Sequence, residues 1–210
     1  MSKPLPTAVR TYFTALRALL VLTVLLGIAY PLLVTGVAQA VFTDQANGSI
    51  VKADGKEIGS SLLGQSYDLP KKNPDDADEA AVPDPQWFQP RPSANGYDPK
   101  VSGASNLGPN SEDLTTTIED RRKAVAAFDG VDPASVPVDA VTASGSSLDP
   151  HISVAYAKEQ VDRIAKTRGN VSPEQLNKLV EKYTDGPSLG FLGQEGVNVV
   201  LLNKALSEQK

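Results

Sequence analysis

The most uniform hydrophobic pattern lies near the N-terminus, where the 25 residues from Ala18 to Phe42 carry no charge. As an α-helix rising about 1.5 Å per residue, this run is about 37 Å long, which exceeds the ~30 Å hydrocarbon core of a bilayer. Pro31 removes a backbone donor and predicts a kink near the outer third of the helix. We predict a transmembrane helix over 14–43, and residues 7–17 can extend it on the N-terminal side.

Charged residues flank the run on one side only. Lys3, Arg10 and Arg17 precede it with no acidic residue among positions 1–43, and Asp44 follows it. Because positive charge stays on the cytoplasmic side, residues 1–13 are expected to be cytoplasmic and 44–210 extracytoplasmic. The later segment holds 17 basic and 25 acidic residues, a net charge of -8.

A cleaved secretory signal is the competing interpretation, since Ala38-Gln39-Ala40 fits a small-x-small cleavage site. The apolar run is longer than the apolar region of a signal peptide, which usually has about 7–15 residues. The segment 1–17 before the run is also long for a signal peptide. These lengths favour an uncleaved anchor. Both interpretations place the remainder of the chain in the same compartment.

The pattern after residue 44 changes to short amphipathic elements. Asp54-Gly55 between two short apolar runs predicts a hairpin. Helical spacing predicts three helices, one ending at Gly130, one starting at Asp149-Pro150 and ending before Gly169, and one capped by Ser172. An apolar run interrupted by Asn198 predicts a buried strand over 197–202, followed by a short helix from about Asn203. The fold class is therefore α+β.

Two segments have no regular period. Residues 70–86 are acidic and rich in Pro and Asp, which predicts a mobile, solvated loop. Residues 87–110 contain Trp87, Phe88 and Tyr97 among Pro, Gly, Ser and Asn, which predicts an irregular segment held by its aromatic side chains.

Composition excludes several classes of function. The chain has no cysteine, which removes disulfides and thiolate chemistry, and a single histidine, His151, which rules out a multi-histidine metal centre. An acidic chain with a pI near 4.9 is a poor nucleic-acid binder. The acidic positions 75, 76, 78 and 79 do not have EF-hand spacing, so no metal site is expected.

Two motifs bear on nucleotides or hydrolysis. Gly59 to Ser66 has P-loop spacing with Gln65 in place of the lysine, and a turn-rich loop is the favoured interpretation. Ser144, Ser146 and His151 lie close together in the sequence, but the Gly-x-Ser-x-Gly frame of a nucleophile elbow is absent. A serine hydrolase is thus a remote alternative, and an anion-binding loop before a helix is another.

The ordered set of segments resembles the C subunit of the Kdp-type potassium-transporting ATPase, a bacterial P-type pump. The resemblance is carried by the N-terminal span and by the segments 59–65, 87–94, 102–109, 137–153, 189–193 and 197–199. Ser147 stands where the family pattern has Gly, and Val154 where it has Pro.

The resemblance implies an accessory, non-catalytic subunit in the bacterial cell membrane, without a tightly bound cofactor. The implied partners are the lipid bilayer, a channel-like potassium-binding subunit and a P-type ATP-hydrolysing subunit. No Asp-Lys-Thr-Gly-Thr phosphorylation motif occurs in this chain. Candidate partner contacts are Gly27, Gly36, Trp87, Arg91 and Asn106.

The family has two proposed roles, and the expected topology distinguishes them. An extracytoplasmic domain can anchor the complex and cap the extracellular ion entrance of the channel-like subunit, but cannot meet cytosolic ATP. The alternative is a catalytic chaperone that raises the ATP affinity of the hydrolytic subunit, with Gln65, Ser144 and Ser146 as candidate nucleotide contacts.

Overall fold

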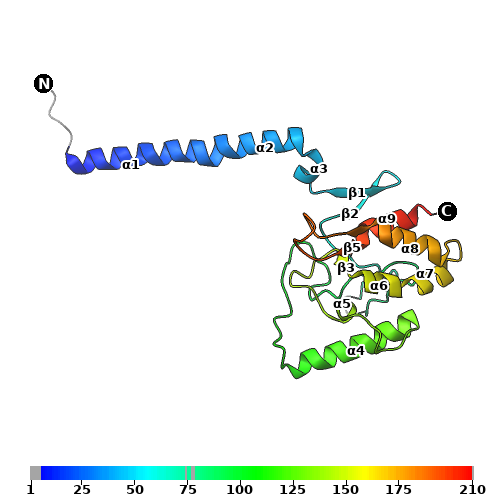
Figure 1. Cartoon of the computed structure of the whole chain (residues 1–210). Helices are drawn as coiled ribbons and strands as arrows, with labels where there is room; N and C mark the ends of the chain where they lie inside the picture. Colours follow the sequence, from blue (N-terminus) through cyan, green and yellow to red (C-terminus); the bar gives the residue numbers. More distant parts are fainter. Residues whose placement is uncertain (1–5, 74, 77–78, 210) are drawn as a thin grey trace. The chain divides into compact units, whose positions relative to one another are not determined.

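The computed structural model describes residues 6–73, 75–76 and 79–209. The chain separates into two compact units, one reaching Ser49 and one starting at Ile50. Figure 1 shows a long helix in the first unit and a mixed helix and sheet domain in the second. The expected architecture, an apolar N-terminal helix followed by an α+β domain, is confirmed.

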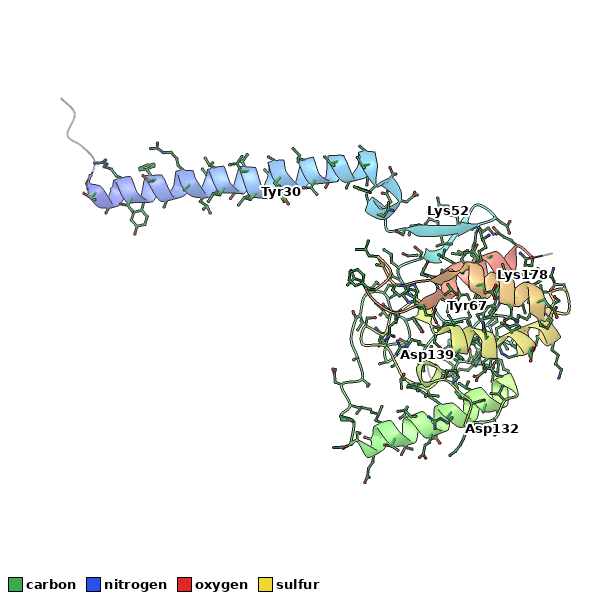
Figure 2. All side chains as sticks on the ribbon, viewed as in Figure 1. Tyr30, Lys52, Tyr67, Asp132, Asp139 and Lys178 are labelled. Atoms are coloured by element: carbon green, nitrogen blue, oxygen red, sulfur yellow. The ribbon has the colours of Figure 1, made fainter. Side chains whose placement is uncertain are left out.

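The first unit is almost entirely helical. It contains α1 (Thr7–Val24), a π-helical turn η1 (Leu25–Ala29), α2 (Tyr30–Val41) and the short α3 (Thr43–Ala46). Within the described residues, Thr7–Val41 is the one helix long and apolar enough to cross a membrane. Side chains such as Tyr30 project outward along it without being covered by other parts of the chain (Figure 2).

A π-helical turn ends two residues before Pro31, and the kink itself stays a prediction. Proline has no N–H, so the Gly27 carbonyl four residues earlier loses its usual partner. A π turn is one of the known ways in which a helix accommodates such a defect.

The second unit opens with the predicted hairpin, formed by β1 (Ile50–Ala53) and β2 (Lys56–Ser60) in antiparallel register. Asp54 and Gly55 have φ values of 50° and 76°. Two successive positive φ angles are what a type I′ hairpin turn requires.

Two helix boundaries follow the sequence signals closely. Ser111 caps α4 (Glu112–Asp129), which ends at Gly130 with a φ of 74°. Ser172 and Gln175 form the expected capping box of α8 (Pro173–Lys182).

Four more helices and a second, small sheet complete the described part of this unit. The helices are α5 (Val138–Val141), α6 (Val154–Glu159), α7 (Val161–Arg168) and α9 (Val199–Ser207). The sheet has the antiparallel order β3-β5-β4, from His151–Ile152, Gly196–Asn198 and Thr184–Asp185. The largest fully buried apolar side chains are Phe88, Ile164, Leu176, Leu202 and Leu206.

Two predicted boundaries are wrong. Asp149-Pro150 does not start a helix, because His151 and Ile152 pair with β5, and α6 begins only after the Ser153 cap. The apolar run 197–202 is a strand only to Asn198. The Asn198 side chain accepts hydrogen bonds from the Val200 and Leu201 N–H groups and so starts α9 at Val199.

The segment 87–110 is irregular and held by its aromatics, as predicted, with Phe88 fully buried. Most described residues between 70 and 83 are exposed. The Lys72 and Asn73 N–H groups donate to the Glu79 carboxylate. Pro74, Ala77 and Asp78 lie outside the described residues, and the mobility of 70–86 stays a prediction.

Candidate functional site

The two loops that carry the candidate motifs, 59–66 and 144–151, meet at Gly64. Its N–H donates to the Leu148 carbonyl over 2.8 Å. A Cβ at Gly64 would stand 2.6 Å from Tyr97 Cε1 and 2.7 Å from the Asp149 carbonyl oxygen, so only glycine fits this approach. No helix follows the 59–66 loop before Glu112 in the described residues, so the strand-loop-helix context of a P-loop is absent.

Gln65 is engaged within its own loop. Its Nε2 donates to the Tyr67 hydroxyl over 3.0 Å. A Cβ on Gly59 would stand only 2.5 Å from the Gln65 Oε1, so the side chain also lies against Gly59. The side chain therefore bridges the ends of the turn and does not project as a phosphate ligand would.

Ser144 and Ser146 do come together, around a hollow of about 490 Å³ that Leu62, Leu63, Arg91 and Asp149 also line. Ser144 is buried and Ser146 is exposed. The Ser146 hydroxyl accepts a hydrogen bond from the Leu148 N–H over 3.1 Å, which shapes the turn before β3. The structure thus joins Ser144, Ser146 and Arg91, while Gln65 lies apart from this hollow.

Arg91 holds this part of the domain together. Its Nη1 lies 3.3 Å from Asp149 Oδ2, and its Nε and Nη2 donate to the Thr142 carbonyl. The side chain is partly buried. Arg91 is therefore committed to contacts inside its own chain, which weakens its assignment as a partner contact.

His151 lies between two carboxylates, with Nδ1 3.4 Å from Asp149 Oδ1 and Nε2 3.8 Å from Asp185 Oδ2. The hydrogen bond with Asp149 is the main cause that raises the pKa of His151. Partial burial raises the pKa of Asp149, but hydrogen bonds from His151 and the charge of Arg91 outweigh it and the net pKa is lowered.

This geometry does not assemble a hydrolase. Both imidazole nitrogens face carboxylates, so neither is placed to take a proton from Ser144 or Ser146. The described residues also contain no group of three or more His, Cys, Asp or Glu side chains arranged to hold a metal ion.

The other candidate partner contacts differ in their surroundings. Trp87 is packed within the domain, with its ring 6.3 Å from that of Tyr67 and 5.0 Å from the Arg168 guanidinium. Asn106 is exposed in a left-handed conformation with a φ of 55°. Gly27 and Gly36 lie on the exposed apolar helix, with open space at Gly36.

Sequence reasoning missed the buried polar side chains that hold Phe88 and Gln89 in place. Asn203 exchanges two hydrogen bonds with the Phe88 backbone, over 3.0 and 2.9 Å. Gln160 does the same for the Gln89 backbone, over 2.6 and 3.1 Å. Each side-chain amide pairs with a backbone N–H and a backbone carbonyl, as a neighbouring β-strand would. The signal in the sequence is a polar residue among apolar positions of a helix.

Comparison with known proteins agrees with this arrangement over almost the whole chain. The family model described as "K+-transporting ATPase, c chain" matches residues 12–208. The chain belongs to the KdpC family. Among its relatives are three potassium-transporting ATPase KdpC subunits. The one from Streptomyces avermitilis is 47% identical, covering 99% of this chain and 98% of the relative, and the one from Kineococcus radiotolerans is 48% identical, covering 98% and 97%.

A KdpC subunit from Mycobacterium bovis is 46% identical over 94% of this chain and 97% of its own length. As a KdpC family member, the chain is a subunit of a potassium-transporting ATPase, and it is not the hydrolytic subunit.

Proposed function

We propose that the chain is an accessory subunit that crosses the membrane once, anchors the potassium pump, and caps the extracellular ion entrance of its channel-like subunit. The observation that carries the proposal is the exposed apolar helix with positive charge on its N-terminal side only. By the positive-inside rule, residues 1–13 belong in the cytoplasm and the α+β domain outside the cell.

The length of the helix supports a crossing with close helix contacts. The helix Thr7–Val41 has 35 residues. At the α-helical rise it extends about 52 Å, which leaves several turns beyond a ~30 Å hydrocarbon core. Arg10 and Arg17 lie toward the N-terminal end, where their charges can reach the cytoplasmic headgroups. The small residues Gly27 and Gly36 allow another helix of the pump to approach closely.

The charge of the outer domain fits a position at an ion entrance. Its net charge of -8 enriches cations near its surface. Salt screens this effect beyond about 8–10 Å. The enrichment is not selective for potassium, and selectivity is left to the channel-like subunit.

The test separates anchoring from docking. In one variant residues 1–43 are deleted, and in a second they are replaced by an unrelated single-span helix of the same orientation. Both should lose co-purification with the other pump subunits, because the helix provides specific contacts as well as anchorage. Stoichiometric assembly of either variant would contradict a docking role for the helix.

A second candidate function is favoured by the hollow that Ser144, Ser146 and Arg91 line, since hydroxyls and a cation can contact phosphate. In that case the domain would raise the ATP affinity of the hydrolytic subunit. Ser146→Ala and Ser144→Ala should then increase the apparent KM for ATP of the assembled pump. An unchanged KM in both variants supports the capping role.

A further inference from the structure

An unusual apolar turn connects the last two strands of the domain. Residues 186–195 link β4 to β5, which pair antiparallel with Thr184 opposite Val197 and Asp185 opposite Gly196. Asp185 also faces His151 of β3 at 3.8 Å. The base of the connection is therefore fixed by the sheet.

The turn in the middle of this connection is held by backbone hydrogen bonds. Ser188 and Leu192 exchange two hydrogen bonds, over 2.8 and 2.9 Å, and the Gly190 N–H donates to the Pro187 carbonyl over 3.0 Å. Leu189 has a φ of 56°. This left-handed conformation is unfavourable for a bulky side chain, and strain of this kind is found most often where a residue serves a function.

The turn presents three large apolar side chains to solvent, which we call the apolar tip: Leu189, Phe191 and Leu192. They are 83%, 74% and 52% exposed. Backbone groups of the turn are hydrogen-bonded to one another. The apolar side chains can therefore be buried in a partner without leaving those backbone groups unpaired. Contiguous exposed apolar residues of this kind mark interaction sites.

The surrounding charges indicate what the partner is. No Lys or Arg occurs between Lys182 and Lys204, and Asp185 and Glu195 flank the tip. A segment that binds anionic lipid headgroups carries basic residues, and these acidic flanks would be repelled. A protein pocket is the occupant that fits an apolar tip with acidic flanks.

We propose that the apolar tip inserts into an apolar pocket on the extracytoplasmic surface of the channel-like subunit and so holds the domain over the ion entrance. This inference rests on the proposed function, because it requires the domain to be outside the cell and next to that subunit.

The first experiment compares the full-length double variant Leu189→Ser/Phe191→Ser with Val138→Ser in the assembled pump. Val138 is 69% exposed on α5 and serves as a control for losing an exposed apolar side chain. Removing two anchors from the centre of an interface should weaken retention of the subunit by about tenfold or more. Val138→Ser should have no effect, and wild-type retention of the double variant would overturn the proposal.

The second experiment distinguishes protein from lipid. Since the chain has no cysteine, Phe191→Cys gives one attachment point for an environment-sensitive fluorophore. The labelled full-length chain is placed in nanodiscs of phosphatidylethanolamine and phosphatidylglycerol, first alone and then with the channel-like subunit. A blue shift that needs the channel-like subunit is expected. A shift in lipid alone, or no shift in either sample, would overturn the proposal.

These outcomes are separate from failure of the proposed function. If the domain is extracytoplasmic and the double variant assembles and transports normally, only the role of the tip is lost. If the domain is cytosolic, the capping function fails together with the tip.

Discussion

The buried contact between Arg163 and Asp129 allows a quantitative test of how the domain is held together. Arg163 Nε lies 2.6 Å from Asp129 Oδ1, and the two side chains are 5% and 1% exposed. Arg163 also donates to the Trp87 carbonyl and to Gln160 Oε1, over 3.1 and 2.8 Å. One guanidinium thus joins α4, α7 and the irregular segment around Trp87. We predict that Arg163→Met destabilises the domain severely.

The magnitude follows from the burial. Asp129 Oδ2 has no hydrogen-bond partner among the described residues, so removing Arg163 leaves the whole carboxylate unpaired. Breaking a buried ion pair on one side costs about 3–5 kcal/mol, out of a total stability of about 5–15 kcal/mol. With a urea dependence of about 2 kcal/mol per molar, the unfolding midpoint should fall by about 1.5–2.5 M.

The assay is urea unfolding of the full chain in detergent, followed by the fluorescence of Trp87, the single tryptophan. Lys178→Met is the matched control, because Lys178 is exposed on α8. Its loss should change stability by about 0.5 kcal/mol or less. In the double variant Arg163→Met/Asp129→Leu, much of the stability should return, since no charge is then left buried. A loss below about 1 kcal/mol in Arg163→Met would refute this reasoning.

Two further predictions use the same unfolding assay. Burial, with repulsion from Asp129 and Asp139, raises the pKa of Glu159 to about 7. The folded chain therefore retains a proton that the unfolded chain releases above pH ~4.5, and stability falls as pH rises toward 7. Glu159→Gln should be more stable than wild type at pH 8 and similar to it near pH 4.5; equal midpoints at pH 8 would contradict this. A Cβ at Gly64 meets Tyr97 and the Asp149 carbonyl, whereas Gly145 has open space. Gly64→Ala should therefore cost about 1–3 kcal/mol, and Gly145→Ala should be near neutral. Equal behaviour of the two alanine variants would count against the close approach at Gly64.

The sequence predicts those elements whose signals are local. Asp54-Gly55 specifies its own turn geometry, and Ser172 with Gln175 satisfies the N–H groups of its own helix, so both appear as expected. The apolar N-terminal helix is equally clear, since composition alone separates it from the rest of the chain.

The errors arise where tertiary contacts outweigh local preference. Asp149-Pro150 has the form of a helix start, but His151 and Ile152 pair with a strand that lies much later in the chain. The run after Gly196 is apolar except for Asn198, because its strand and most of the first turns of α9 are buried, so periodicity does not separate the two.

The candidate site was only partly accessible from the sequence. The sequence indicates Ser144, Ser146 and Arg91 separately, and the fold brings them around one hollow. The sequence suggests contacts of Gln65 and Trp87 with other molecules, whereas the structure gives both side chains partners within the domain. The amides of Gln160 and Asn203 were missed, because a polar residue in a helix does not reveal which distant backbone it will bind.

The central claim is that the domain after Ile50 faces away from the cytosol. The most direct measurement fuses a reporter after Lys210 in cells that assemble the pump, using alkaline phosphatase in one strain and a green fluorescent protein in another. The account predicts an active phosphatase and a dark fluorescent protein, because the former folds outside and the latter inside the cell. A bright fluorescent protein with an inactive phosphatase would place the domain beside cytosolic ATP and contradict the capping role.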